Sequence, residues 1–232
     1  MTQQIAVRPA PCTPAERVTR SLLGYGVLAG PLYVGATLIQ GLTRSGFDLA
    51  HDDASLLSNG GLGWIQVTNL LLTGLMTLAF ALGMRRALAG RVGGTWGPVL
   101  VGIYGLGLMA AGVLRADPAD GYPAGAPAGR SPTLSWHAAG HIAAAGIGFC
   151  ALVAACSVLA RHFGHNGRRG LAAYSLISGL VFLAGFAGVA SGSNAGAVVG
   201  AFWVAVVVAW TWVAVLAVYL YRAAAPSNVD YI

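Results

Sequence analysis

Residues 134–160 read LSWHAAGHIAAAGIGFCALVAACSVLA and contain no Asp, Glu, Lys or Arg. A helix needs about 20 predominantly apolar residues to cross the hydrocarbon core of a bilayer, so this stretch is long enough to span a membrane. Two histidines, His137 and His141, lie close to its start. An imidazole at the mouth of a membrane helix is energetically costly and requires a polar partner. The stretch therefore predicts a membrane-spanning helix whose first turns carry a polar feature.

The same pattern recurs along the whole chain. Hydrophobic residues make up 56% of the 232 residues and charged residues only 9%, whereas soluble proteins carry roughly a quarter charged residues. The composition therefore predicts an all-α, polytopic integral membrane protein in which six transmembrane helices form a bundle. We expect this membrane domain to cover residues 21–222. The six apolar spans cover about residues 22–42, 62–84, 95–114, 134–160, 171–191 and 197–220.

The arginines predict the orientation of these spans. All thirteen basic residues are Arg, and they are scattered among short loops, which argues against a nucleic-acid partner despite the net charge of +6. Ten of them lie in the two terminal regions and in the loops at 85–93 and 161–170. Because positive charge favours the cytoplasmic side, we expect cytoplasmic tails at 1–20 and 223–232. The predicted setting is the lipid bilayer of a bacterial plasma membrane, crossed several times.

The opposite, outer side is predicted to hold most of the polar chemistry. Its two long loops contain five of the seven acidic residues of the chain. Asp52 or Asp53, just before the sequence Ala-Ser-Leu-Leu, fits the N-cap of a short interfacial helix. The imidazoles and carboxylates expected on this side are Asp48, His51, Asp52, Asp53, Asp117, Asp120, His137 and His141.

These residues suggest a metal site. Histidines at positions i and i+4 lie on one helix face, so His137 and His141 can both reach one zinc ion. His51 would supply a third ligand and leave a position open for water, while Asp53 or Asp117 would act as a ligand or general base. The HxxxH spacing is weakly specific, and an alternative needs no metal. In that alternative His141 hydrogen-bonds a neighbouring helix and His137 lies in the wet interface.

Two stretches of the chain resemble a bacterial and archaeal membrane family, domain of unknown function 998 (DUF998). The first is GFDLAHDDASLLSNGGLGW at residues 46–64. The second is GVLRADPADGYP at residues 112–123, followed by His137 and His141 at the head of the next span. The resemblance covers about residues 22–222. It implies a six-helix integral membrane protein and no particular activity.

A more distant likeness is to membrane hydrolases of the alkaline-ceramidase and adiponectin-receptor type. These enzymes hold zinc with histidines inside a seven-helix bundle, and the features that suggest them here are Ser135, the histidine pair and a nearby aspartate. This chain departs from the pattern, because it has six predicted spans and carries the pair in the fourth.

Three functions are consistent with the sequence. The first is a non-enzymatic membrane protein that binds or senses a small molecule, a lipid or a partner at its outer rim. The second is a zinc-dependent hydrolase that acts on a lipid. The third is a small-solute transporter, although no span carries a charge near its middle, where coupling residues usually lie.

Overall fold

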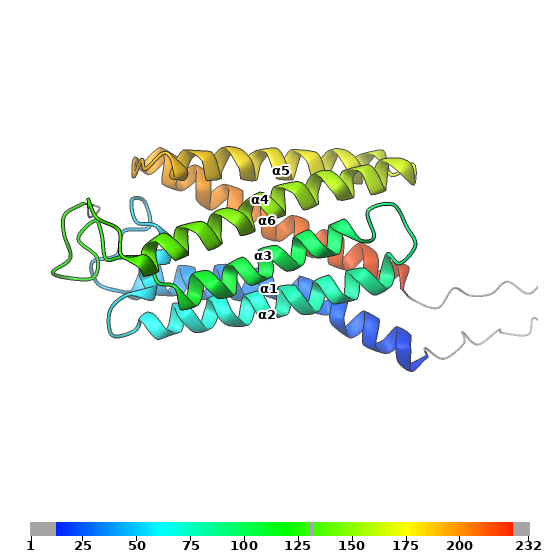
Figure 1. Ribbon diagram of the computed structural model, residues 1–232, viewed down its shortest axis with the longest axis horizontal. Coiled ribbons are helices and arrows are strands. Elements are labelled where there is room, and N and C mark those ends of the chain that lie inside the picture. Colours follow the sequence, from blue (N-terminus) through cyan, green and yellow to red (C-terminus); the bar gives the residue numbers. More distant parts are fainter. Residues whose placement is uncertain (1–12, 130–131, 225–232) are drawn as a thin grey trace, which may run out of the picture.

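The computed structural model describes residues 13–129 and 132–224, and these residues form six long helices and one short 3-10 helix, η1 (Figure 1). All six long helices are long and apolar enough to cross a membrane, which confirms the predicted fold class. Helix α1 begins and helix α6 ends at the same end of the molecule. The helices are α1 (Pro14–Thr43), η1 (Ala54–Ser58), α2 (Gly63–Ala87), α3 (Trp96–Val113), α4 (Trp136–His165), α5 (Arg169–Ala190) and α6 (Gly196–Ala223).

The six long helices form a closed ring. Each helix packs against the next in sequence, and α6 packs back against α1. Glycines permit the close approaches: a Cβ atom on Gly26 of α1 would lie 2.7 Å from the ring of Phe80 and 2.8 Å from Ala217. Small residues play this part in membrane helices, because no hydrophobic force drives helices together inside lipid. The ring positions residues from all six helices around one interior.

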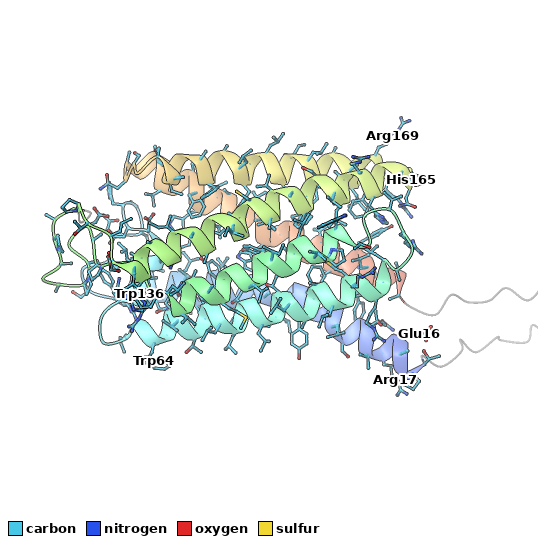
Figure 2. All side chains as sticks on the ribbon, viewed as in Figure 1. Glu16, Arg17, Trp64, Trp136, His165 and Arg169 are labelled. Atoms are coloured by element: carbon cyan, nitrogen blue, oxygen red, sulfur yellow. The ribbon has the colours of Figure 1, made fainter. Side chains whose placement is uncertain are left out.

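The two ends of the ring differ in charge. We call the end with Asp48, Asp52, Asp53, Asp117 and Asp120 the acidic end, and the end with the loops after α2 and α4 the arginine end. Figure 2 shows Trp64 and Trp136 at the acidic end, whereas Arg17, His165 and Arg169 lie at the arginine end. The two tryptophans are 64% and 72% exposed, as expected of side chains that contact a membrane interface.

Helix α1 starts earlier than the sequence predicted. Residues 14–20 were expected to belong to a tail, but Pro14 occupies the first turn of the helix. Thr13 and Glu16 form a capping box, in which the Glu16 N–H donates to Thr13 Oγ1 (3.3 Å) and the Thr13 N–H donates to Glu16 Oε2 (2.7 Å). This box satisfies helix donors that would otherwise lack partners. The remaining parts of the predicted tails, residues 1–12 and 225–232, lie outside the described residues.

The loops at the acidic end are tied to each other and to the ring. The guanidinium of Arg44, the C-cap residue of α1, donates to the carbonyl oxygens of Leu57 and Asn59 and to the hydroxyl of Tyr122. The side-chain amide of Asn59 donates to the Ala116 carbonyl at 3.1 Å. The short helix η1 confirms that a short helix follows Asp53. These loops therefore hold η1 in place above the interior of the ring.

Candidate functional site

A cavity of about 340 Å³ lies inside the ring, in the half nearer the acidic end. All six long helices and η1 contribute residues to its wall. Much of the wall is aromatic: Phe149 of α4 contacts Phe186 of α5 and Phe202 of α6, with ring centroids 5.2 and 5.9 Å apart. Tyr104 of α3 continues this surface at 6.4 Å from Phe149. The cavity therefore offers a mostly apolar surface of the kind that small-molecule sites use.

Polar groups gather at the end of the cavity nearest η1. Asp53, Gln66 and His141 all line it there. Gln66 is 1% exposed, and its Oε1 accepts hydrogen bonds from Gln40 Nε2 (2.8 Å) and Asn69 Nδ2 (3.3 Å). This buried network fixes the Gln66 side chain within the wall, and satisfied polar groups of this kind stabilise helix contacts in a membrane.

His141 is fixed by backbone atoms of the neighbouring helix. Its Nδ1 atom lies 2.9 Å from the Ala111 carbonyl oxygen and 2.8 Å from that of Leu114, at the end of α3. Because a carbonyl oxygen only accepts, Nδ1 is the protonated nitrogen and donates to both. The side chain is 8% exposed, and the residue lines the cavity. This confirms the alternative expectation that His141 hydrogen-bonds an adjacent helix.

The three predicted zinc ligands do not come together. The ring of His137 is exposed and stacks on Trp136, with centroids 3.6 Å apart. His51 pairs through Nδ1 with Asp48 Oδ2 at 2.9 Å, and both side chains are more than half exposed. In the described ranges, no three His, Cys, Asp and Glu side chains are arranged to hold a metal ion. In the structure each of the three histidines is directed toward a different neighbour.

The two aspartates predicted as catalytic residues have different surroundings. Asp117 accepts from the Ser135 N–H (2.8 Å) and the Ser135 hydroxyl (2.6 Å), and that hydroxyl accepts from the Ala138 N–H (3.1 Å) at the start of α4. These hydrogen bonds from Ser135 lower the pKa of Asp117. Asp117 does not line the cavity, whereas Asp53 does. Of this pair, only Asp53 is placed to meet a bound molecule there.

The sequence reasoning missed most of the cavity wall. Tyr33, Tyr104, Phe149, Phe186 and Phe202 belong to five different helices, and each looks like an ordinary apolar residue of its own span. No spacing within one segment signals that they meet. The glycines gave a partial signal, because frequent glycine in a span predicts close packing of neighbouring helices.

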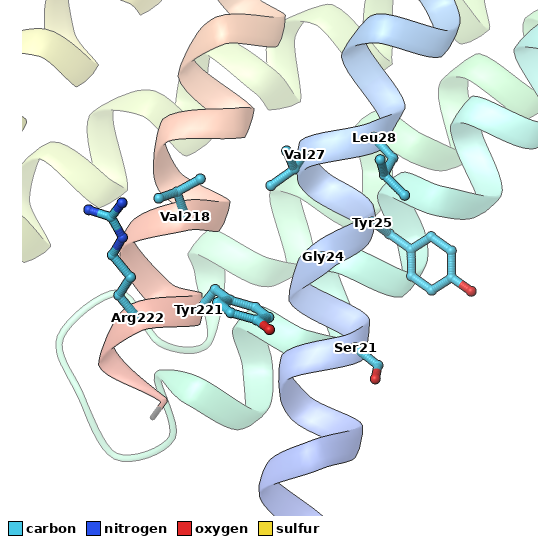
Figure 3. A pocket seen from close by; sticks show the side chains of 8 residues that line it. All are labelled: Ser21, Gly24, Tyr25, Val27, Leu28, Val218, Tyr221 and Arg222. Carbon is cyan, nitrogen blue, oxygen red and sulfur yellow. The ribbon is translucent and has the colours of Figure 1, made fainter. Parts of the chain in front are cut away.

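A second hollow lies at the arginine end, between α1 and α6 (Figure 3). This groove of about 540 Å³ is larger than the cavity, but its lining residues Leu28 and Tyr25 are 58% and 42% exposed, so it opens on the lipid-facing surface. Figure 3 shows Tyr221 extending from α6 toward α1, and the guanidinium of Arg20 lies 4.3 Å from its ring centroid. The groove lacks the converging polar groups of the cavity.

Comparison with known families gives one result. A family model described as "Protein of unknown function (DUF998)" matches residues 27–219. No curated protein and no solved structure matches the chain. The matched range contains every residue that lines the cavity at the acidic end.

Proposed function

We propose that this chain, which belongs to the DUF998 family, binds a membrane lipid in the cavity at its acidic end. One observation carries the proposal: an aromatic, apolar cavity inside the ring ends in a small group of polar side chains. That arrangement is complementary to an amphipathic molecule with a long apolar body and one polar head. The chain is a multi-pass membrane protein, so such molecules surround it on every side.

The wall of the cavity is interrupted toward the bilayer between α4 and α5. Figure 1 shows these helices close together at the arginine end and apart at the acidic end. At the middle of α5, a Cβ atom on Gly179 would lie 2.9 Å from that of Cys156, whereas nearer the acidic end a Cβ atom on Gly146 would lie 4.0 Å from Phe186. Ile142, which lines the cavity, is 56% exposed. A lipid chain would enter sideways through this gap.

With the orientation that the arginines predict, a lipid would enter this gap from the outer leaflet of the membrane. Neither of the other two functions has a comparable observation in its favour. A zinc hydrolase needs a set of converging ligands, and the described residues do not supply three. A coupled transporter needs charged groups near the middle of its spans, and the charged side chains in the described part of the chain lie at the two ends.

A pair of variants of α4 tests the proposal. Ala145 lines the cavity, whereas Ala143, two residues earlier, is exposed on the outside of the same helix. The protein is purified in a mild detergent, and the lipids that remain bound are extracted and quantified by mass spectrometry. We expect wild type and Ala143→Phe to retain about one lipid per chain and Ala145→Phe to lose it. Equal retention by all three would contradict binding in the cavity.

A further inference from the structure

The cavity has a second polar region at its inner end, formed by Tyr33 of α1 and Tyr104 of α3. Both residues line the cavity, and each ring centroid lies 5.7 Å from that of Trp210 in α6. Tyr104 stands near the middle of α3, and Trp210 stands near the middle of α6. The two tyrosines therefore bring hydroxyl groups to a depth about halfway between the two ends of the ring, far from the polar loops.

The hydroxyl of Tyr104 is unmatched by the protein. The residue is 4% exposed, yet its hydroxyl has no hydrogen-bond partner in the part of the chain that the structure describes. Protein atoms do not enclose this hydroxyl completely, so the open space that it faces is the cavity. The same holds for the hydroxyl of the partly buried Tyr33. A hydroxyl left unpaired in apolar surroundings costs free energy, and a bound oxygen atom would recover it.

This inner region is well separated from the polar end near η1. His141 lies there beside Ala111, whose carbonyl accepts from its Nδ1 atom at 2.9 Å. Tyr104 precedes Ala111 by seven residues on α3 (111 − 104 = 7), which is about 10 Å along a helix that rises 1.5 Å per residue. Side chains tilt toward the N-terminus of their helix, so the Tyr104 hydroxyl lies deeper still. The aromatic surface of Phe149 and Phe186 lines the cavity together with these two regions.

We infer that the lipid held in this cavity carries a second oxygen group, a hydroxyl or a carbonyl, within its chain and about 10 Å from its polar head. The head lies at the end near η1, and the hydroxyls of Tyr104 and Tyr33 bind the second oxygen. Tyrosine hydroxyls donate as well as accept, so they fit either oxygen group. This inference rests on the proposed lipid-binding function. It names the chemical class of the lipid and two residues that determine specificity.

The test uses three isomeric diols of one chain length, hexadecane-1,3-diol, hexadecane-1,10-diol and hexadecane-1,15-diol. They have the same composition and differ only in the distance between the two hydroxyls. An extended chain advances about 1.25 Å per carbon–carbon bond, so the hydroxyl-bearing carbons of the 1,10-diol lie about 11 Å apart. The protein is placed in phosphatidylcholine nanodiscs, and each diol displaces bound tritiated hexadecanol, with empty nanodiscs as the blank. We expect the 1,10-diol to compete about tenfold better than the other two.

The outcomes separate this inference from the proposed function. Saturable hexadecanol binding with equal competition by the three diols would leave lipid binding standing. It would overturn the second oxygen group, because water would then satisfy the tyrosines. A preference for the 1,3-diol or the 1,15-diol would overturn it as well. Absence of any saturable binding would contradict both the inference and the proposed function.

Replacing both tyrosines assigns the preference to their hydroxyls. Tyr33→Phe combined with Tyr104→Phe removes the two hydroxyls and keeps the rings beside Trp210. Because neither hydroxyl has a partner among the described residues, we expect the double variant to fold. The affinity for the 1,10-diol, measured relative to hexadecanol, should fall about tenfold. Tyr25→Phe, at a tyrosine of the α1–α6 groove that is 42% exposed, is the matched control. A preference that survives in the double variant, or an equal loss in Tyr25→Phe, would overturn the assignment.

Discussion

The guanidinium of Arg44 donates a hydrogen bond of 3.0 Å to the hydroxyl of Tyr122, a residue 78 positions further along the chain. Arg44 caps α1, and Tyr122 lies in the loop between α3 and α4, so the bond joins the two long loops of the acidic end. Tyr122 also packs edge-on against Phe47, with ring centroids 5.2 Å apart. An arginine on this side of the membrane therefore serves the fold, because its own loop and a distant one both depend on it.

Replacing Tyr122 with Phe should remove this hydrogen bond and keep the ring contact with Phe47. We expect a loss of about 1 kcal/mol of unfolding free energy, seen as a lower melting temperature of the purified protein. Arg44→Met should cost more, because the carbonyls of Leu57 and Asn59 also lose their donor. Tyr25→Phe, at a tyrosine that is 42% exposed, is the control, and an equal loss there would contradict this account.

Ser135 caps the helix that carries both histidines of the HxxxH motif. Its hydroxyl accepts from the Ala138 N–H and donates to Asp117, so one side chain satisfies α4 and anchors the preceding loop. Ser135→Ala should lower the unfolding free energy by about 0.5–2 kcal/mol. Ser45→Ala, at an exposed loop position of the same end, should have no effect on the melting temperature. A neutral result at Ser135 would mean that α4 does not need its cap.

Asp117 should make stability depend on pH in the acid range. Hydrogen bonds from Ser135 lower the pKa of Asp117 below its ordinary value of 3.8, so the folded state favours the carboxylate. The stabilising contribution is therefore present above that value and is lost as the pH falls through the lowered pKa. Melting curves of wild type and Asp117→Asn should differ most near neutral pH and converge as the pH falls through the lowered pKa. A constant difference across this range would contradict the prediction.

The contribution of Asp52 to stability should depend on pH in the opposite direction to that of Asp117. It is 3% exposed and accepts from the Asp48 N–H at 2.7 Å. Burial, and then the neighbouring carboxylates of Asp120, Asp48 and Asp53, raise its pKa. Its contribution to stability is fully present below the ordinary value of 3.8 and is lost as the pH rises through the raised pKa.

An amide at position 52 keeps an acceptor oxygen and removes the charge. Asp52→Asn should therefore melt at a higher temperature than wild type at pH 7, and the difference should disappear in acid. A variant less stable than wild type at neutral pH would show that the Asp52 charge is needed by a neighbour.

Hydropathy was sufficient to predict the six helices, because each span has to satisfy its backbone internally whatever its neighbours are. Helix ends were less predictable where local polar contacts extend a helix beyond its apolar core. At the end of α4, for example, His162 Nδ1 donates to the Val92 carbonyl at 2.7 Å, so the helix continues to His165. Apolar periodicity gives no sign of such a contact between the end of one helix and a distant loop.

The candidate site was predicted only in part. Asp53 and His141 were chosen from the sequence because they are polar residues near the outer rim, and both line the cavity. The sequence paired His141 with His137, and the structure gives them different neighbours: His141 is directed at α3, while His137 stacks on Trp136. Side-chain direction depends on which helix lies alongside, and one sequence does not contain that information.

The contact between Gly107 of α3 and Gly148 of α4 offers the last test, because it borders the cavity directly. A Cβ atom at position 107 would lie 2.8 Å from the Ala144 carbonyl oxygen and 3.0 Å from the Gly148 Cα atom. Both are backbone atoms, so no side chain can rotate away and the two helices must separate. We expect Gly107→Ala to cost about 1–3 kcal/mol and to weaken lipid retention.

Gly200→Ala is the matched control for this substitution, because nothing lies within 4 Å of its Cβ position in α6. There alanine should raise the unfolding free energy by up to about 1 kcal/mol, since glycine loses more backbone entropy in a helix. The two variants make the same chemical change, and only the distance to the neighbouring backbone differs. Melting temperatures that fall at position 107 and rise at position 200 would confirm that helix separation sets the cost. A fall at both would instead point to a general intolerance of added methyl groups.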